Sequence, residues 1–168
     1  TQLINDLLNF SRYQSGQQKL ERSICVLDDL LERARGRYAD AAGNKQVELV
    51  LELDSPLPRI QADVAQLDRV LDNLLDNAIR HTASGGRIRL QARRHGERVI
   101  ISVEDSGEGI AYSQQGRIFE PFVQVGRKKG GAGLGLALCK EIVQLHGGRM
   151  GLYSRPGQGS QFYMALPV

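Results

Sequence analysis

The feature that most constrains this chain is a glycine-rich stretch, residues 105–135, placed between an apolar strand-like run and an apolar helix-like run. Its two glycine clusters read Asp105-Ser-Gly-Glu-Gly-Ile110 and Gly130-Gly-Ala-Gly-Leu-Gly135. Glycine allows positive φ and a close approach of backbone to a ligand, at an entropic cost when neither is needed. Three consecutive cations, Arg127-Lys-Lys129, precede the second cluster. The stretch therefore predicts a lid that binds a polyphosphate.

Composition narrows the class of protein. The 168 residues, 41% hydrophobic and 24% charged, fit one globular domain with or without a short appendage. A net charge of +3, without basic residues clustered among aromatics, argues against a nucleic-acid partner. Cys25 and Cys139 have no metal-ligand spacing, so we expect ordinary core or near-surface thiols in a reducing compartment. No apolar run approaches the ~20 residues of a membrane span, and no signal peptide is visible.

The N-terminal residues predict the end of an amphipathic helix, because Leu3, Ile4, Leu7, Leu8 and Phe10 share one face. The polar segment 11–18 should stop that helix and act as a linker. Two interpretations stay open from these residues: a frayed terminal helix, or the remnant of a helical dimerisation hairpin. A chain that starts in mid-helix without Met looks like a fragment.

The remaining pattern predicts an α+β fold: a two-layer sandwich with a mixed, mainly antiparallel sheet and three helices on one face. Asp28 or Asp29 should cap the first of these helices, and Asp63 the second. The expected helices are 30–42, 64–81 and 134–146, and the expected strands are 24–27, 46–53, 87–93, 98–104, 149–154 and 160–166.

The helix at 64–81 carries polar side chains opposite its apolar stripe. Asn73 and Asn77 are four residues apart, so they lie on the same face, with Arg80 one turn further. An amide oxygen is a hard neutral ligand that suits Mg²⁺, and Arg80 could meet a phosphate oxygen. For this helix alone, a solvated polar face explains the pattern equally simply.

The two glycine clusters have different chemistry. Asp105, at the end of a strand, can accept a hydrogen bond from an exocyclic amine such as adenine N6. The second cluster opens a helix, where free N–H groups suit phosphate. Leu136-Ala137 after the last glycine exclude a Walker P-loop, and Tyr112 and Leu136 break the Rossmann pattern. The cations at 127–129 would then clamp the β- and γ-phosphates.

Taken together and in this order, the motifs resemble the catalytic and ATP-binding domain of bacterial sensor histidine kinases, within the Bergerat-fold superfamily that includes gyrase and MutL. The N box is Asn73-Leu-Leu-Asp-Asn-Ala-Ile-Arg-His-Thr82, and the F box is Phe119-Glu-Pro-Phe122. The segment 157–162 resembles the closing G-x-G-T-x-F, with Ser160 in place of Thr. The resemblance covers residues 19–168, and residues 1–18 resemble the tail of the second dimerisation helix with its linker.

The resemblance implies that ATP and Mg²⁺ are the cofactors, with Asp105 on the adenine amine and Asn77 on the metal. Asn73, Arg80, Arg127 and Lys128 would serve the phosphates. Ser160 would support Asp105 through a hydroxyl or water, and the lid would lie between the F box and the second glycine box. The positions implied to bind nucleotide are Asn77, His81, Asp105, Gly107, Gly109, Ile110, Phe122, Gly131, Gly133, Leu134, Gly135, Leu136, Ser160 and Phe162.

The resemblance also implies a histidine kinase rather than an ATP hydrolase. ATP hydrolases of the superfamily carry a water-activating glutamate where this chain has Asn73, and an amide is no general base. His81, His95 and His146 lack the H-E-x-x-x-P context of a phosphoacceptor, so we expect the chain to bind ATP without phosphorylating itself.

The implied partners are the phosphoacceptor helices of a homodimeric parent kinase and a response regulator, and the fragment itself could be a monomer. The implied location is cytoplasmic, with the parent anchored in the inner membrane. The alternatives are a gyrase- or MutL-type ATPase, an anti-sigma-type serine kinase, or a nucleotide-binding module without catalysis.

Overall fold

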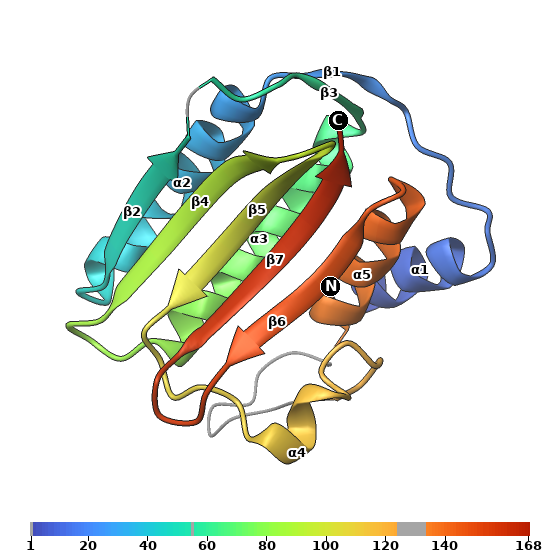
Figure 1. Ribbon diagram of the computed structural model, residues 1–168. Coiled ribbons are helices and arrows are strands. Elements are labelled where there is room, and N and C mark those ends of the chain that lie inside the picture. Colours follow the sequence, from blue (N-terminus) through green and yellow to red (C-terminus); the bar gives the residue numbers. More distant parts are fainter. Residues whose placement is uncertain (1, 55, 124–133) are drawn as a thin grey trace.

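The computed structural model describes residues 2–54, 56–123 and 134–168, and Figure 1 shows their arrangement. Arg127, Lys128, Gly131, Gly133 and most of the predicted lid lie outside the described residues. The helices are α1 (Gln2–Gln14), α2 (Leu27–Asn44), α3 (Val64–His81), α4 (Tyr112–Gln115) and α5 (Gly135–Leu145). The strands are β1 (Ser23–Cys25), β2 (Glu48–Leu53), β3 (Ile60–Ala62), β4 (Arg87–His95), β5 (Arg98–Asp105), β6 (Arg149–Ser154) and β7 (Ser160–Pro167).

A five-stranded sheet in the order β2-β4-β5-β7-β6 forms one layer of the molecule. The β2–β4 pair is parallel, and the other three pairs are antiparallel. Helices α2, α3 and α5 cover one face of this sheet, and α1 packs against α5 (Figure 1). The predicted fold class, a mixed and mainly antiparallel sheet with three helices on one face, is confirmed.

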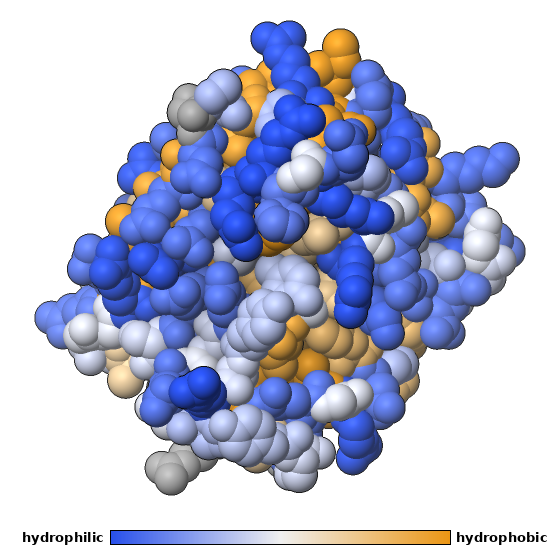
Figure 2. Space-filling model, viewed as in Figure 1, coloured by the Kyte–Doolittle hydropathy of each residue, from blue (hydrophilic) through white to orange (hydrophobic). Residues whose placement is uncertain are grey.

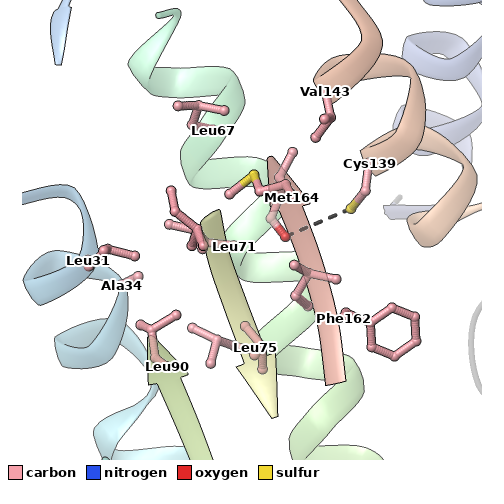
Figure 3. Close-up of a cluster of buried hydrophobic side chains, with 14 of the residues drawn as sticks. Leu31, Ala34, Leu67, Leu71, Leu75, Leu90, Cys139, Val143, Phe162 and Met164 are labelled. Atoms are coloured by element: carbon pink, nitrogen blue, oxygen red, sulfur yellow. Dashed lines mark hydrogen bonds between the residues drawn. The ribbon is translucent and has the colours of Figure 1, made fainter. Parts of the chain in front are cut away.

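Helix α3 lies at the centre of the helical layer, and its sequence explains its bounds. Asp63 is its N-cap, with the side chain accepting a hydrogen bond from the Gln66 N–H at 3.2 Å, as predicted. Leucines at 67, 71, 74 and 75 are fully buried. Figure 3 shows three of them between Leu31 and Ala34 of α2 and Val143 of α5. Because the leucine stripe packs in the core, the opposite face of α3 is available for a functional site.

The opposite face of the sheet carries none of the described helices, and it is mainly hydrophilic in Figure 2. Arg89 bridges Glu52 of β2 at 3.5 Å and Glu104 of β5 at 3.2 Å across this face. Alternation of apolar and polar side chains along β4 and β5 is typical of a sheet with one solvated side. The core therefore lies between this sheet and the helices.

Helix α2 starts earlier than predicted. It begins at Leu27, and its N-cap Val26 makes no side-chain capping hydrogen bond, so the predicted cap at Asp28 or Asp29 is wrong. Burial of Leu27, Leu30 and Leu31 on one helical face explains the earlier start. The two aspartates lie instead in the first turn, where their charge favours the helix dipole.

The other departures concern short or packed segments. Helix α1 continues past Phe10 to Gln14, because Phe10 and Tyr13 are both buried and Tyr13 donates a hydrogen bond to the Gln66 side chain. Strand β3, which was missed, pairs with β1 in a separate two-stranded sheet. Helix α4 was also missed. No described helix is long and apolar enough to cross a membrane.

Candidate functional site

A narrow pocket lies beside the first glycine cluster, where the end of α3 meets the end of β5 and the start of β7. Antiparallel pairing of β5 with β7 places Asp105 opposite Ser160, and Val103 opposite Phe162. The last turn of α3 meets these strand ends from the helical side. The lining residues are Asn77, His81, Asp105, Glu108, Gly109, Ile110, Ile118, Ser160 and Phe162.

Asp105 is the buried carboxylate of the pocket, with a side chain only 5% exposed. Its Oδ1 accepts a hydrogen bond from the Gly107 N–H at 2.9 Å. Burial raises the pKa of Asp105 from 3.8 to about 6, against the lowering effect of backbone hydrogen bonds from Gly107 and Ser160. A buried, mostly ionised acceptor at neutral pH is suited to bind an amine N–H.

The backbone N–H of Ser160 donates a hydrogen bond to the Asp105 carboxylate. Support of Asp105 through the Ser160 hydroxyl or a water stays a prediction. The Ser160 hydroxyl lies 3.0 Å from that of Ser154, which in turn accepts from the Ile110 N–H at 2.9 Å. Two serines of neighbouring strands thereby fix the loop that carries the apolar wall of the pocket.

Glycines allow the first cluster to pack closely around the pocket. A Cβ on Gly107 would lie 2.3 Å from the backbone oxygen of His81. Gly109 has a φ of +72°, and its Cβ would lie 2.1 Å from the oxygen of Arg155. Real Cβ atoms do not make such contacts, so neither position accepts a side chain without a backbone shift.

Three side chains of α3 lie at or beside the pocket. Asn77 and His81 line it, and Arg80 donates a long hydrogen bond of 3.4 Å to Asn77 Oδ1. His81 Nδ1 lies 3.3 Å from Glu108 Oε1. Burial lowers the pKa of His81, and the Glu108 hydrogen bond opposes that shift. Because the hydrogen bond from Arg80 to Asn77 Oδ1 is long, this amide oxygen is available as a ligand at the pocket.

The donor set fits Mg²⁺ only in the company of phosphate. The described residues contain no cluster of three or more His, Cys, Asp or Glu that could hold a metal by themselves. Mg²⁺ keeps several waters and takes the remaining ligands from one or two protein oxygens and from substrate phosphates. Asn77 Oδ1 would be the protein ligand in such a site.

Asn73 faces the start of α5 rather than the pocket. Its Nδ2 donates to the Gly135 carbonyl oxygen at 3.4 Å, and a Cβ on Gly135 would lie 3.7 Å from the amide. Asn73 therefore joins α3 to the helix that follows the second glycine cluster. Its role toward phosphate remains a prediction.

The apolar walls are only partly those expected. Ile110 and Phe162 line the pocket, as does Ile118, which sequence reasoning missed. Phe119 of the F box stacks edge-on against Phe162, with ring centroids 6.2 Å apart. This contact anchors the start of the F box to strand β7.

Five of the described residues that were predicted to bind nucleotide do not line the pocket: Gly107, Phe122, Leu134, Gly135 and Leu136. Phe122 is 64% exposed, and Leu134 is buried against Phe10 and Ala137. Leu136 packs against the main core. Glu108 was not predicted as a site residue, although its position inside the first glycine box was the signal that could have found it.

Comparison with known proteins agrees with this geometry. Residues 62–168 match the family described as "Histidine kinase-, DNA gyrase B-, and HSP90-like ATPase". The match covers well over half of the chain and includes every pocket residue named above. The chain therefore belongs to this family of ATPases.

Within the family, the most similar proteins found are sensor kinases. The chain is 66% identical over 166 residues to the alginate biosynthesis sensor protein KinB of Pseudomonas aeruginosa, covering 99% of this chain and 28% of KinB. Full-length ShkA, solved in complex with AMPPNP, superposes with a TM-score of 0.91 at 34% identity, covering 99% of this chain and 35% of ShkA.

The nucleotide-free catalytic domain of the histidine kinase ThkA superposes with a TM-score of 0.78 at 28% identity, covering 88% of this chain and 96% of that domain. A second ThkA structure, in complex with the response regulator protein TrrA, has a TM-score of 0.79 at 24% identity and covers 99% of this chain and 48% of that one. The chain thus has the fold of a histidine kinase catalytic domain, and it spans little more than a quarter of the length of KinB.

Proposed function

We propose that this chain binds Mg-ATP and transfers the γ-phosphoryl group to a histidine on the dimerisation helices of its parent kinase. The observation that carries the proposal is the buried Asp105 carboxylate in a pocket walled by Ile110 and Phe162. Such a pocket offers an apolar slot for a flat ring and one charged acceptor for its amine. A guanine ring would present a carbonyl oxygen where adenine presents the amine, so Asp105 favours adenine.

The phosphates would extend from the pocket past Asn77 toward Arg80 and the start of α5. Asn77 would hold Mg²⁺, which supplies neutralisation of the phosphate charge when bound. Arg80 is exposed, and its hydrogen bond to Asn77 Oδ1 is long at 3.4 Å, so its guanidinium can turn to a phosphate oxygen. Arg127 and Lys128 are predicted to add positive charge from outside the described residues.

The chemical step needs positioning more than acid–base groups. The bond between the γ-phosphorus and its bridging oxygen breaks, a phosphorus–nitrogen bond to the imidazole forms, and ADP leaves. Asn73 contacts Gly135 and is an amide, so it supplies no base to activate water. This supports transfer to histidine over hydrolysis.

The partners and location follow from the same proposal. The acceptor helices would belong to a homodimeric parent, with α1 as the tail of the second helix and residues 15–22 as the linker. A response regulator would receive the phosphoryl group in the next step. The proposal also includes a parent anchored in the inner membrane, with this domain on the side where ATP is found.

Calorimetry with AMPPNP tests the binding step. We expect saturable binding by the wild-type chain in Mg²⁺ and weaker binding in EDTA, with Asn77→Ala showing little response to the metal. Asn44→Ala, an exposed amide in the last turn of α2, is the matched control and should bind as the wild type does.

Radiolabelled ATP tests the transfer. The chain alone should form no acid-labile phosphohistidine, whereas added dimerisation helices of the parent should become labelled. Steady ATP hydrolysis by the chain alone, abolished by Asn73→Ala, would instead support the ATPase alternative. Absence of any AMPPNP binding would contradict the proposal that the chain binds Mg-ATP.

A further inference from the structure

The C-terminal end of α3 carries the site and also needs partners for its own backbone. Asn77, Arg80 and His81 lie on its last two turns. The last four carbonyl groups of a helix have no partner within it, and together they carry about half a negative charge. A negative helix end beside an anionic ligand disfavours binding unless a cation offsets it.

The carbonyl oxygens of residues 78, 79 and 80 each accept a hydrogen bond from a neighbouring residue. Thr82 Oγ1 donates to the Ala78 oxygen at 2.6 Å, and the Thr82 N–H donates to the Ile79 oxygen at a long 3.4 Å. The Lys45 ammonium donates to the Ile79 oxygen at 2.5 Å and to the Arg80 oxygen at 3.3 Å. Lys45 is thus a cation bound directly to the carbonyls of this helix end, in addition to Arg80 in the last turn of α3 itself.

Lys45 is held in place by the turn that contains it. It is the C-cap residue of α2, with its N–H directed to the Ala41 and Ala42 oxygens. Gln46 follows with a φ of +61°, and its carbonyl oxygen accepts from the Gly85 N–H at 2.8 Å. The Ser84 hydroxyl donates to the Gln46 side chain at 2.9 Å. The turn after α2 is thereby tied to the turn after α3.

The end of α3 also sets the position of the first glycine cluster. Gly107 packs so closely on the His81 oxygen that a Cβ would lie 2.3 Å from it. The Gly107 N–H in turn donates to Asp105 Oδ1. A shift of the last turn of α3 therefore moves Gly107 and changes the setting of Asp105.

From these contacts we infer that Lys45 is a positioning residue of the nucleotide site: it holds the last turn of α3 against the pocket and offsets the negative end of that helix. The inference rests on the proposed function and deepens it. Lys45 acts through the backbone of α3 and does not line the pocket. Its charge also lowers the pKa of His81, after the larger effects of burial and of Arg80.

The test compares Lys45→Met, which keeps the aliphatic stem, with Lys45→Arg, which keeps the cation. Lys19→Met, an exposed lysine in the linker before β1, controls for net charge. Calorimetry with AMPPNP and Mg²⁺ should show affinity about tenfold weaker for Lys45→Met, within about threefold of wild type for Lys45→Arg, and unchanged for Lys19→Met.

NMR titration of the His81 ring supplies a readout that a purely structural role would not move. Its midpoint should rise in Lys45→Met and return toward wild type in Lys45→Arg. If the Met variant does not fold, Lys45→Gln, which keeps a donor without the charge, takes its place in both measurements. Wild-type affinity together with an unchanged His81 midpoint would overturn the inference, whereas failure of the wild-type chain to bind AMPPNP would overturn the proposed function instead.

Discussion

The backbone N–H of Asp63 donates to Nε2 of His146 at 3.0 Å, which joins the start of α3 to the end of α5. Nδ1 of His146 lies 2.8 Å from the Ile142 oxygen, so the neutral tautomer with its proton on Nδ1 satisfies both contacts. Asp63 additionally accepts from the Glu21 N–H at 3.0 Å. One buried imidazole and one cap residue thus bring together the linker and the two helices that flank the site.

Acidification should weaken this junction. Burial lowers the pKa of His146 below its usual 6.5, so the folded protein binds this proton less readily than the unfolded chain does. Its stabilising contribution is complete above pH 6.5 and is lost as the pH falls through the lowered pKa. We expect the urea midpoint to depend less on pH between 7.5 and 5 in His146→Gln than in the wild type. His95→Gln, at the exposed β4–β5 turn, controls for the loss of one imidazole.

Asp105→Asn should raise stability while it reduces nucleotide affinity. The pKa of Asp105 is raised to about 6, so its ionised form destabilises the fold, and this cost grows as the pH rises from about 4 to above 6. Removing the charge should increase the free energy of unfolding at pH 7.5 by up to about 2–3 kcal/mol, with little gain at pH 4. Differential scanning calorimetry at both values checks this.

The same substitution should weaken AMPPNP binding at least about tenfold, because a charge-assisted hydrogen bond is lost. Glu104→Gln is the matched control, since the neighbouring carboxylate pairs with Arg89 on the open face of the sheet. Unchanged AMPPNP affinity in Asp105→Asn would contradict the proposal that Asp105 binds the adenine amine. An equal loss in Glu104→Gln would show that the effect is not specific to the pocket.

Gly109→Ala and Gly157→Ala separate crowding from backbone strain. Both glycines have positive φ, +72° and +80°, but a Cβ on Gly157 meets nothing within 4 Å. Gly157→Ala should therefore cost about 1–2 kcal/mol of stability. Gly109→Ala, whose Cβ would lie 2.1 Å from the Arg155 oxygen, should cost clearly more and also impair AMPPNP binding. Equal losses in urea denaturation would contradict the crowding argument.

Phe10→Ala should detach α1 from α5. Phe10 is 7% exposed and packs with Leu134 and Ala137, whereas Leu8 on the same helix is 52% exposed. We expect Phe10→Ala to lower stability by about 3 kcal/mol and Leu8→Ala by less than about 0.5 kcal/mol. Chemical denaturation of the two variants gives the comparison. A similar effect of both would mean that α1 is not docked in solution.

The fold was predictable where a local sequence signal, such as a helix cap, and the pattern of apolar residues indicated the same element. The bounds of α3 followed from the Asp63 cap and a continuous leucine stripe, and β7 from strict alternation. Strand β3 was missed because its three residues pair only with β1, which is far away in sequence. Helix α2 began early because buried Leu27 outweighed the aspartate cap signal.

The site was predictable at positions fixed by strand ends and by the last turn of α3. Asn77, His81, Asp105 and Ser160 meet in one pocket as expected. Leu134 illustrates what sequence could not supply, because its burial depends on Phe10, a residue of a helix more than a hundred positions earlier. Lys45 likewise reaches α3 only through tertiary contact between two turns.

Cys25 and Cys139 are both free and buried in the main core, Cys25 on strand β1 and Cys139 on helix α5. Burial raises the pKa of each thiol, so neither reacts readily while the fold is closed. The rate at which a thiol reagent modifies each one is then limited by opening of the structure around it. The chain thus contains two natural reporters of local unfolding, one on strand β1 and one on helix α5, and neither requires an engineered label.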